Sequence, residues 1–498
     1  MTRLRVTCKS ILSYRPPYTP LPNPTDKQAK RSSTALFGLI LIIIVGRGIL
    51  SSLLPVMEFS EARYAEIARQ ILVTNQWVTL WFDTNVPFWG KPPLAFWSIA
   101  VSYLLLGVTE FSARLPSLLF SIATGLSIYA WCKKRLSKDT ARLALLSYAT
   151  SMIVLQTAGS VITDPLLTLC TTLVMISFWE AVKYKNHAAA YMMWVLLAAG
   201  MLTKGLVAIV LCGMACGLWV VIFKHWRDFF SYTHLLTGLL LTTLITVPWY
   251  YLAEINTPGF LQYFLIGEHF ERFVQSEWAG DPYGAVKDRP FGTIWLYFVF
   301  AALPWSLVLL AGICLSRTRT SWLNSFNENQ HLATYLLIWA LTPLVFFTPA
   351  KNVLVTYVLP SIPAFCVLLA LLLTKSRWQF PLAGASVVLF FLGSALLYQI
   401  YFDSHRYNQR PIIDKYYELS QSDPGVLIYT GKRRFAPVFY TQGKVLFENT
   451  ETRHGMPPGT FYIAVWDLWL AEQTARLTPR CTPSVTRNEF TLFYCPSD

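Results

Sequence analysis

Charged side chains are scarce in this chain, and their scarcity restricts its class more than any other property. Only 14% of its 498 residues are charged and 54% are hydrophobic, whereas a soluble domain carries about 25% charged residues. The sequence also lacks a Walker A motif and a G-x-G-x-x-G turn after a strand. These absences exclude a cytosolic NTP-driven enzyme or pump and indicate an integral membrane protein.

Cysteine is sparse too, and none of the nine cysteines has zinc-finger spacing. Cys481 and Cys495 lie near the C-terminus and could close a hairpin as a disulfide, if they face an oxidising compartment. The net charge of +14 does not indicate nucleic-acid binding. About half of the basic residues lie in the tail 1–33 and in short connections, which is the positive-inside bias of membrane proteins.

Long apolar runs are what the sequence does contain. Since a span needs about 20 apolar residues, we predict about eleven spanning helices. They are 34–54, 114–131, 143–158, 165–182, 188–203, 205–222, 233–252, 292–315, 332–348, 353–374 and 379–400. The apolar segment 94–106 is short, and a crossing there would move the basic connection 132–142 to the outer side. We therefore interpret 94–106 as an interfacial or re-entrant helix.

These spans imply a basic cytoplasmic tail 1–33, a transmembrane domain 34–400 and an outer domain 401–498. The connections predicted inside are all basic. The outer connections include two long ones, 55–113 and 253–291, and the spacing within 61–73 predicts a helix in the membrane plane. The last hundred residues predict a small α/β domain. Its predicted strands are 426–430, 444–448, 461–465 and 490–494, and its helices are 411–420 and 467–477.

Polar residues gather in the predicted outer connections, where each has a local and a functional interpretation. Ser60 and Glu61 suit a helix start, as does Asp164 before a proline. Lys91, between aromatics and a proline pair, either points at a phosphate or snorkels to the interface. Together the residues suggest one site that combines cations for a phosphate with carboxylates for proton transfer. The carboxylates are Glu58, Glu61 and Asp164, and the candidate substrate-contacting residues are Lys91, Tyr64, Lys204, His269, Arg272 and Tyr357.

In this order along the chain, the segments SEARYAEIARQIL, FWGKPPLAFW, FSARLPS, TDPLL, LTKG and NVLVTYVLP resemble the lipid A aminoarabinose transferases. These belong with the protein O-mannosyltransferase-like enzymes among the membrane-embedded GT-C glycosyltransferases. The resemblance covers roughly residues 35–375. It implies a polyprenyl-phosphate-linked sugar as donor and transfer on the periplasmic face. It further implies that Lys91 holds the lipid phosphate, helped by Tyr357 and by Arg272 or Lys204, and that Asp164 matches an acidic position tied to activity.

Two positions depart from the family pattern. The family has Asp-Glu where this chain has Ser60-Glu61, so Glu61 or Glu58 would take the role of the missing aspartate. The aminoarabinose members have Glu before Lys-Pro where this chain has Gly90, which removes a metal partner for His269. No cofactor is predicted with certainty, and a divalent metal stays open.

The sequence therefore predicts a polytopic α-helical, GT-C-type glycosyltransferase of the inner membrane. Its donor would be a polyprenyl-phosphate sugar and its acceptor lipid A or another molecule on the periplasmic face, with no role for nucleic acid. A phosphate acceptor needs no strong base, whereas a hydroxyl acceptor would need Glu61, Glu58 or Asp164. The alternatives are a protein O-glycosyltransferase, a transporter of lipid-linked sugars, which would carry charges in mid-span, and an inactive homologue.

Overall fold

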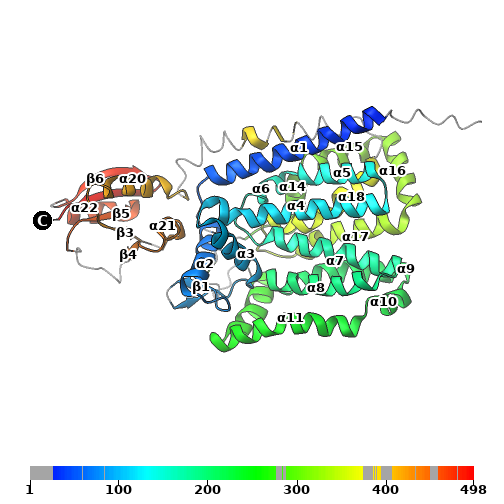
Figure 1. The fold of residues 1–498 in the computed structure, drawn as a ribbon, viewed down its shortest axis with the longest axis horizontal. Coiled ribbons are helices and arrows are strands. Elements are labelled where there is room, and N and C mark those ends of the chain that lie inside the picture. The colour runs from blue at the N-terminus through cyan, green and yellow to red at the C-terminus, as the bar shows by residue number, and fades with distance from the viewer. Residues whose placement is uncertain are drawn as a thin grey trace, which may run out of the picture.

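The apolar runs of the sequence form helices that lie side by side in a bundle, and an α/β domain lies beyond one end of that bundle (Figure 1). The computed structural model describes residues 26–497, except 59, 84, 276–282, 284–287, 374–384, 386, 389, 394–406, 432, 449–457 and 479. The side chains of 26–33, 35 and 317 are also outside the description. Much of the predicted tail 1–33 therefore lies outside the described residues.

Six of the described helices are long and apolar enough to cross a membrane. They correspond, within two residues at the ends where they fall short, to the predicted spans 34–54, 114–131, 165–182, 233–252, 332–348 and 353–374. These elements are α1 (Asp26–Leu53), α4 (Glu110–Arg135), α7 (Asp164–Tyr184), α11 (Leu235–Asn256), α17 (Gln330–Phe347), and the 3-10 helix η2 (Val355–Ser361) continued by α18 (Ile362–Leu373). A seventh crossing results if α14 (Thr293–Ala301) and α15 (Trp305–Cys314), which are bent by 104°, count as one span. The protein is thus a multi-span membrane protein.

The described residues thus contain six or seven crossings where about eleven were predicted. Of the other predicted spans, 188–203 and 205–222 each form a single helix that is not among the six, whereas 143–158 does not form one helix. The segment 143–158 is divided between α5 (Lys138–Ala149) and α6 (Met152–Thr157). At the break, the hydroxyls of Thr150 and Ser151 donate to carbonyls four residues back, at 2.6 and 2.7 Å, a pattern that bends helices. Most of 379–400 lies outside the described residues. The remaining helices of the bundle are α8 (His187–Lys204), α9 (Val207–Phe223), α10 (Trp226–Tyr232) and α16 (Ser316–Glu328).

One end of the bundle carries the two long connections, and we call it the α2–α3 end (Figure 1). Its first connection contains α2 (Ser60–Thr74), the hairpin β1 (Trp81–Asp83) and β2 (Val86–Pro87), and α3 (Leu94–Leu106). Its second contains α12 (Phe260–Gln262), the π-helix η1 (Tyr263–Glu271) and α13 (Arg272–Val274). With 13 residues, α3 is about 20 Å long, shorter than the ~30 Å hydrocarbon core, as its non-spanning interpretation required.

The C-terminal domain is built on a five-stranded sheet in the order β4-β3-β5-β7-β6. Strands β4, β3 and β5 run parallel to one another, and β7 is antiparallel to both of its neighbours, β5 and β6. Apolar clusters cover both faces, and the predicted disulfide between Cys481 and Cys495 is present. The strands are β3 (Val426–Thr430), β4 (Leu446–Glu448), β5 (Phe461–Trp466), β6 (Thr482–Arg487) and β7 (Phe490–Cys495), and the helices are α20 (Arg410–Ser420), α21 (Phe435–Tyr440), the 3-10 turn η4 (Asp467–Trp469) and α22 (Leu470–Leu477).

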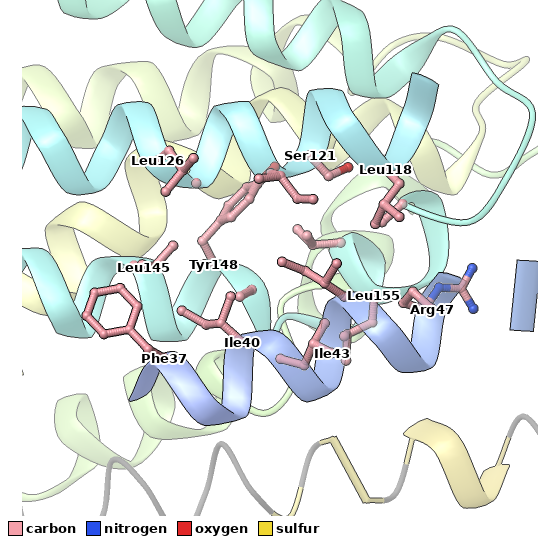
Figure 2. Close-up of a pocket in the computed structure, with 16 residues that line it drawn as sticks. Phe37, Ile40, Ile43, Arg47, Leu118, Ser121, Leu126, Leu145, Tyr148 and Leu155 are labelled. Carbon is pink, nitrogen blue, oxygen red and sulfur yellow. The ribbon is translucent and has the colours of Figure 1, made fainter. Parts of the chain in front are cut away.

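This domain packs on the α2–α3 end. Phe435 and Phe439 of α21 join an apolar cluster that includes residues of α2 and α3. Polar contacts reinforce the junction, among them an ion pair of 2.9 Å between Arg410 and Glu110. Within the bundle, α1, α4, α5 and α6 line a largely apolar pocket (Figure 2). Of these two places, the polar α2–α3 end is the one suited to a charged ligand.

Candidate active site

The structure divides the predicted site residues into groups rather than one cluster. One group joins two cations through a carboxylate, and a second joins a carboxylate, an ammonium and an aromatic ring. Two predicted carboxylates lie in neither group. The members are Lys91 and Arg272 in the first group, Asp164, Lys204 and Tyr357 in the second, and Glu58 and Glu61 outside both.

The loop before α3 fixes the backbone that carries Lys91. Tyr283 donates its hydroxyl hydrogen to the carbonyl of Pro87 at 2.6 Å and accepts from the amide of Trp89 at 3.2 Å. The Lys91 ammonium donates to the carbonyl of Gly90 at 2.6 Å. A side chain at Gly90 would collide with the ring of Phe88 at 2.9 Å, so the loop depends on glycine there. The prediction that this lysine is held rather than floppy is confirmed.

Lys91 and Arg272 share one carboxylate, that of Glu268. Lys91 forms an ion pair with it, and Nη1 of Arg272 lies 2.9 and 2.8 Å from its two oxygens. The side chain of Glu268 is only 8% exposed, whereas that of Arg272 is 25% exposed. Burial alone would raise the pKa of Glu268, but Lys91 and Arg272 outweigh it and hold that pKa below its usual value. Two cations against one anion leave the group with a formal surplus of one positive charge.

The second group lies where α7 begins and α8 ends. Asp164, the first residue of α7, forms an ion pair of 2.7 Å with Lys204, the last residue of α8. The Lys204 ammonium also lies 4.5 Å from the centre of the Tyr357 ring, in cation–π geometry. Both charged side chains are about one-tenth exposed, at 10% and 11%. Lys204 is thus paired inside the protein rather than snorkelling.

His269 connects the two groups but does not present a free metal ligand. Its Nδ1 lies 2.6 Å from the carbonyl of Phe264, and its Nε2 accepts from the amide of Leu206 at 3.1 Å. Gly205 makes room for the ring, because an added Cβ would lie 2.5 Å from Nε2. Burial lowers the pKa of His269, which suits the neutral ring that these two bonds require. Within the described residues, no group of three His, Cys, Asp or Glu side chains could hold a metal.

Through His269 the two cationic groups become neighbours. Glu268, which holds Lys91 and Arg272, precedes His269 directly, and the histidine contacts the turn that follows Lys204. The field of Tyr64, the remaining candidate, also acts on Lys204, while its ring packs in the apolar layer between α2 and α3. The structure therefore brings together three cations, Lys91, Lys204 and Arg272, in one region.

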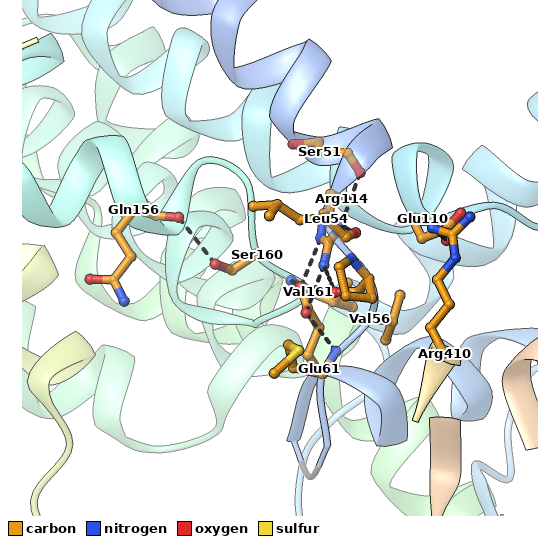
Figure 3. A network of polar contacts seen from close by, with 12 residues as sticks. Ser51, Leu54, Val56, Glu61, Glu110, Arg114, Gln156, Ser160, Val161 and Arg410 are labelled. Atoms are coloured by element: carbon orange, nitrogen blue, oxygen red, sulfur yellow. Dashed lines mark hydrogen bonds and ion pairs between the residues drawn. The ribbon is translucent and has the colours of Figure 1, made fainter. Parts of the chain in front are cut away.

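Glu61, predicted as a base, has a structural role instead (Figure 3). It forms a bidentate ion pair with Arg114, at 2.9 and 2.8 Å, and accepts amide hydrogens from Met57 and Val161, both at 3.1 Å. Burial acts to raise the pKa of Glu61, but Arg114 and these hydrogen bonds lower it below its usual value. Because this carboxylate is already occupied by four donors, the prediction of a catalytic Glu61 is not supported by its surroundings.

Arg114 extends the same network into the backbone. Its guanidinium donates to three carbonyls, one in the last turn of α1 and two in the segment that joins α1 to α2. These belong to Ser51, Leu54 and Pro55, at distances of 2.9, 2.6 and 2.8 Å. The pair thus fixes the end of α1 and the start of α2 to α4. This positioning role explains why the Glu61–Arg114 pair is buried, without a catalytic role for Glu61.

Glu58 is also placed away from the cationic groups. It is 5% exposed, and one carboxylate oxygen accepts from the amide of Ala436 in α21. Its own amide donates to the carbonyl of Tyr407 at 3.0 Å. Burial raises the pKa of Glu58 to about 7, against the bond from Ala436 and the field of Arg434, which lower it. Glu58 therefore belongs to the junction with the C-terminal domain, and its predicted catalytic role is not supported.

The raised pKa of Glu58 predicts a pH-dependent junction. The folded protein favours the protonated acid, so the contribution of this group is greatest below its unfolded pKa and falls as pH rises towards 7. Its size is roughly 3 kcal/mol at most, since one pKa unit corresponds to about 1.4 kcal/mol. We expect the α21 amides to exchange hydrogen faster at pH 8 than at pH 6, after correction for intrinsic rates, and Glu58→Gln to abolish the difference. An equal difference in Glu58→Gln and in the surface control Glu418→Gln would contradict this.

The sequence interpretation missed two residues of these networks, Glu268 and Arg114. Glu268 lies four residues before Arg272, a spacing at which helical side chains meet, so an ion pair could have been expected there. Arg114 lies near the start of a predicted span, where a buried charge needs a partner. Neither pattern identifies the distant partner, which lies 177 residues away for Lys91 and 53 residues away for Glu61.

Comparison with known proteins places this geometry in context. Residues 90–252 match the family described as dolichyl-phosphate-mannose-protein mannosyltransferase, a range that contains Lys91, Asp164 and Lys204. An undecaprenyl phosphate-alpha-4-amino-4-deoxy-L-arabinose arabinosyl transferase of Erwinia tasmaniensis is 30% identical over 319 residues, which is 62% of this chain and 54% of that protein. The protein of the same description from Enterobacter sp. is 30% identical over 353 residues, 69% of this chain and 59% of that protein. The chain thus spans less than two thirds of the length of these curated relatives.

Two solved structures share the fold. Crystal structures of ArnT from Cupriavidus metallidurans, one bound to undecaprenyl phosphate and one in the apo state, superpose with TM-scores of 0.73 and 0.72 at 17% sequence identity. Each alignment covers 93% of this chain and 98% of the other. The match extends over nearly the whole chain, so the bundle and the C-terminal domain together follow one known architecture.

Proposed function

This chain belongs to the GT-C glycosyltransferases related to the aminoarabinose transferases, and on that premise we propose that it transfers a sugar from a polyprenyl-phosphate donor to an acceptor at the α2–α3 end. The observation that carries the proposal is the group of Lys91, Glu268 and Arg272, whose surplus positive charge suits a lipid phosphate. The acceptor that we propose first is lipid A, because the resemblance to the lipid A aminoarabinose transferases supports it.

In the proposed reaction, an acceptor oxygen attacks the anomeric carbon and the bond from that carbon to the phosphate oxygen breaks. The lipid phosphate leaves with an additional negative charge. Lys91 and Arg272 would stabilise that charge, since pre-positioned cations favour the charge that develops in the transition state. Lys204 and the Tyr357 ring lie next to this region. They would contact the sugar or the phosphate from the side opposite Lys91 and Arg272.

The acceptor determines whether a base is needed. A phosphate acceptor is already anionic, whereas a hydroxyl must lose a proton in the step. Of the three carboxylates predicted for this role, Asp164 is the one that we retain, because Glu58 and Glu61 are committed to structural contacts. Lys204 fixes the Asp164 carboxylate by their 2.7 Å ion pair, and the proton of a hydroxyl acceptor would pass to it.

We expect Asp164→Asn to separate these two chemistries once the acceptor is identified. With a hydroxyl acceptor, kcat should fall by roughly 100-fold or more, because general-base catalysis contributes about 10²–10⁴-fold. Donor binding, measured as the affinity for polyprenyl phosphate, should change little. The control is Asp139→Asn, because the Asp139 side chain is 75% exposed in the first turn of α5. An unchanged kcat with a hydroxyl acceptor would exclude Asp164 as the base.

A protein acceptor is the second candidate, and the matched family description favours it because that family is named for transfer to protein. In either case we propose an inner-membrane location with the tail 1–33 in the cytoplasm. The α2–α3 end and the domain 401–498 would then lie in the periplasm. The basic connections at the opposite end, such as 132–142, support this orientation.

Mass spectrometry of lipid A, total glycolipids and glycoproteins from cells with and without the gene would test the proposal. Loss of one aminopentose-, pentose- or hexosamine-sized unit from lipid A would support a lipid A transferase and name the sugar class. An intact lipid A with a glycan lost from protein would move the acceptor to protein. No change in any fraction, with the protein present in the membrane, would contradict transfer and favour the transporter or inactive-homologue alternatives.

A further inference from the structure

The C-terminal domain contacts the β1–β2 hairpin as well as α2 and α3. Phe435, the first residue of α21, lies with its ring centre 4.9 Å from that of Phe82 in β1, in an edge-on arrangement. Beside it, Arg433 forms an ion pair of 2.6 Å with Asp83, the next residue of the same strand. Phe435 is only 5% exposed, so the ring contact is buried. Strand β1 is therefore held on the domain by an aromatic contact and an ion pair.

The hairpin connects this contact to the loop before α3 that carries Lys91. Strand β2 ends at Pro87, four residues before Lys91. It pairs antiparallel with β1, and the amide of Phe88 donates to the carbonyl of Leu80 at 2.7 Å. Because the two strands are hydrogen-bonded to each other, a displacement of β1 is transmitted to β2. The position of β1 therefore determines the position of the backbone that carries Lys91.

Aromatic side chains follow the same route from the domain to the loop. The ring centre of Tyr283 lies 5.0 Å from that of Phe82 and 4.9 Å from that of Phe88. The Tyr283 hydroxyl is bonded to the loop backbone on both sides of Phe88. Edge-on and tilted ring pairs with centres about 4.5–7 Å apart are favourable beyond the area that they bury. The rings of Phe435, Phe82 and Tyr283 thus form a continuous series of contacts that ends at the loop.

We propose that Phe435 and Arg433 of the C-terminal domain are positioning residues for Lys91. Their contacts with β1 fix the hairpin, and the hairpin fixes the loop that directs the Lys91 ammonium. The two residues act through the hairpin and need no contact with the lipid phosphate. A displacement of a reacting group by about 1 Å can lower a rate by about 100-fold, so a fixed loop matters for transfer. This inference rests on the proposed function, because it concerns the placement of the proposed phosphate-binding lysine.

Phe435→Ala removes the ring contact with Phe82, and Phe439→Ala is its matched control. Both phenylalanines belong to α21, are 5% and 4% exposed, and join the same apolar cluster at the junction. The ring of Phe439, however, pairs with that of Tyr440, at 5.3 Å between centres. Each variant removes one buried phenyl ring, so the two should lose similar stability. A difference between them in the loop therefore reports positioning.

Hydrogen exchange of the loop amides in the purified full-length protein is the first readout, because it requires no sugar transfer. We expect the amides of Phe88 and Trp89 to exchange about tenfold faster in Phe435→Ala than in the wild type, an effect of the size that loss of one aromatic pair allows. In Phe439→Ala they should exchange at the wild-type rate. Phe435→Leu keeps an apolar side chain against β1 and should restore part of the protection.

Transfer per folded molecule, with a polyprenyl-phosphate sugar as donor, is the second readout. We expect kcat to fall by about tenfold or more in Phe435→Ala and to stay within about twofold in Phe439→Ala. The charge reversals Arg433→Asp and Asp83→Arg should each lower kcat by about two- to fivefold, since the pair is only partly buried. The double variant should restore kcat, because the reversed charges can pair again.

Two results would overturn the proposal. The first is loop exchange that is the same in Phe435→Ala as in Phe439→Ala. The second is faster exchange in Phe435→Ala with an unchanged kcat, which would separate the domain contact from Lys91. If Phe435→Ala does not accumulate in the membrane, the charge reversals decide, and single variants with wild-type kcat or a double variant no better than they are would contradict it. A wild-type protein that transfers no sugar, while its loop exchange depends on Phe435, would contradict the proposed function and leave the link between domain and loop in place.

Discussion

Lys91→Met should reduce sugar transfer by about 100- to 1,000-fold, the usual effect of removing one pre-positioned group that stabilises transition-state charge. The ammonium of Lys91 is held by a fixed loop and paired with Glu268, so methionine keeps the volume and removes only the charge. Glu268 would then retain one cation, Arg272, and the surplus positive charge of the group would disappear. We expect the affinity for undecaprenyl phosphate to fall together with kcat, because the same charge acts in both.

The matched control is Lys351→Met, because Lys351 is an exposed lysine of the connection between α17 and η2. That variant should transfer sugar at the wild-type rate. The measurement is steady-state transfer together with a binding titration of undecaprenyl phosphate for each purified variant. Equal loss in both variants would point to a general effect of net charge, and a wild-type rate for Lys91→Met would remove Lys91 from the phosphate site.

Glu61→Gln should destabilise the protein without disabling the chemistry. It leaves the Arg114 guanidinium buried without its counter-charge, and breaking a buried ion pair in this way costs about 3–5 kcal/mol. Since the pKa of Glu61 is lowered in the folded protein, its contribution is present at neutral pH and is lost as the pH falls through that lowered pKa, the opposite sign to Glu58. We expect less folded protein in the membrane and a lower unfolding temperature.

The activity per folded molecule is the readout that separates the two roles of Glu61. We expect it to stay within a few-fold of the wild type, whereas loss of a general base would lower it by about 10²–10⁴-fold. Glu418→Gln is the control, because that carboxylate is 67% exposed in a surface pair with Lys415, where little stability is at stake. A fully stable Glu61→Gln protein with no activity would restore the catalytic interpretation of Glu61.

Much of the fold could be predicted because hydrophobic content alone identifies segments that must leave water. The six long spans follow from this, as do the short α3 and the apolar strands β3, β5 and β7. The break between α14 and α15 was hidden in the continuous apolar run 292–315, although Pro304 interrupts the backbone donors there. Strand β6, with the sequence TPSVTR, is mostly exposed at the sheet edge and is specified by its pairing to β7 rather than by its own composition.

The site was harder to predict than the fold, because charge in the sequence does not reveal its partner. Local patterns predicted one site that includes Lys91, Asp164, Lys204 and Arg272, and the structure places them in two neighbouring groups. They also favoured Glu61, whose position beside a missing family aspartate suggested chemistry. The structure instead gives that carboxylate to Arg114, and gives Lys91 the carboxylate of Glu268. Such pairings depend on how distant helices pack, which neither periodicity nor spacing specifies.

The central claim is that the α2–α3 end transfers a sugar from a polyprenyl phosphate. The most direct measurement incubates the purified full-length protein, in lipid nanodiscs, with undecaprenyl phosphate-linked aminoarabinose and lipid A, and follows both lipids by mass spectrometry. We expect free undecaprenyl phosphate to form in step with the sugar gained by lipid A, and both to disappear with Lys91→Met. A donor that stays intact with lipid A and with every hydroxyl-bearing acceptor offered, in protein that is folded and binds undecaprenyl phosphate, would contradict the claim.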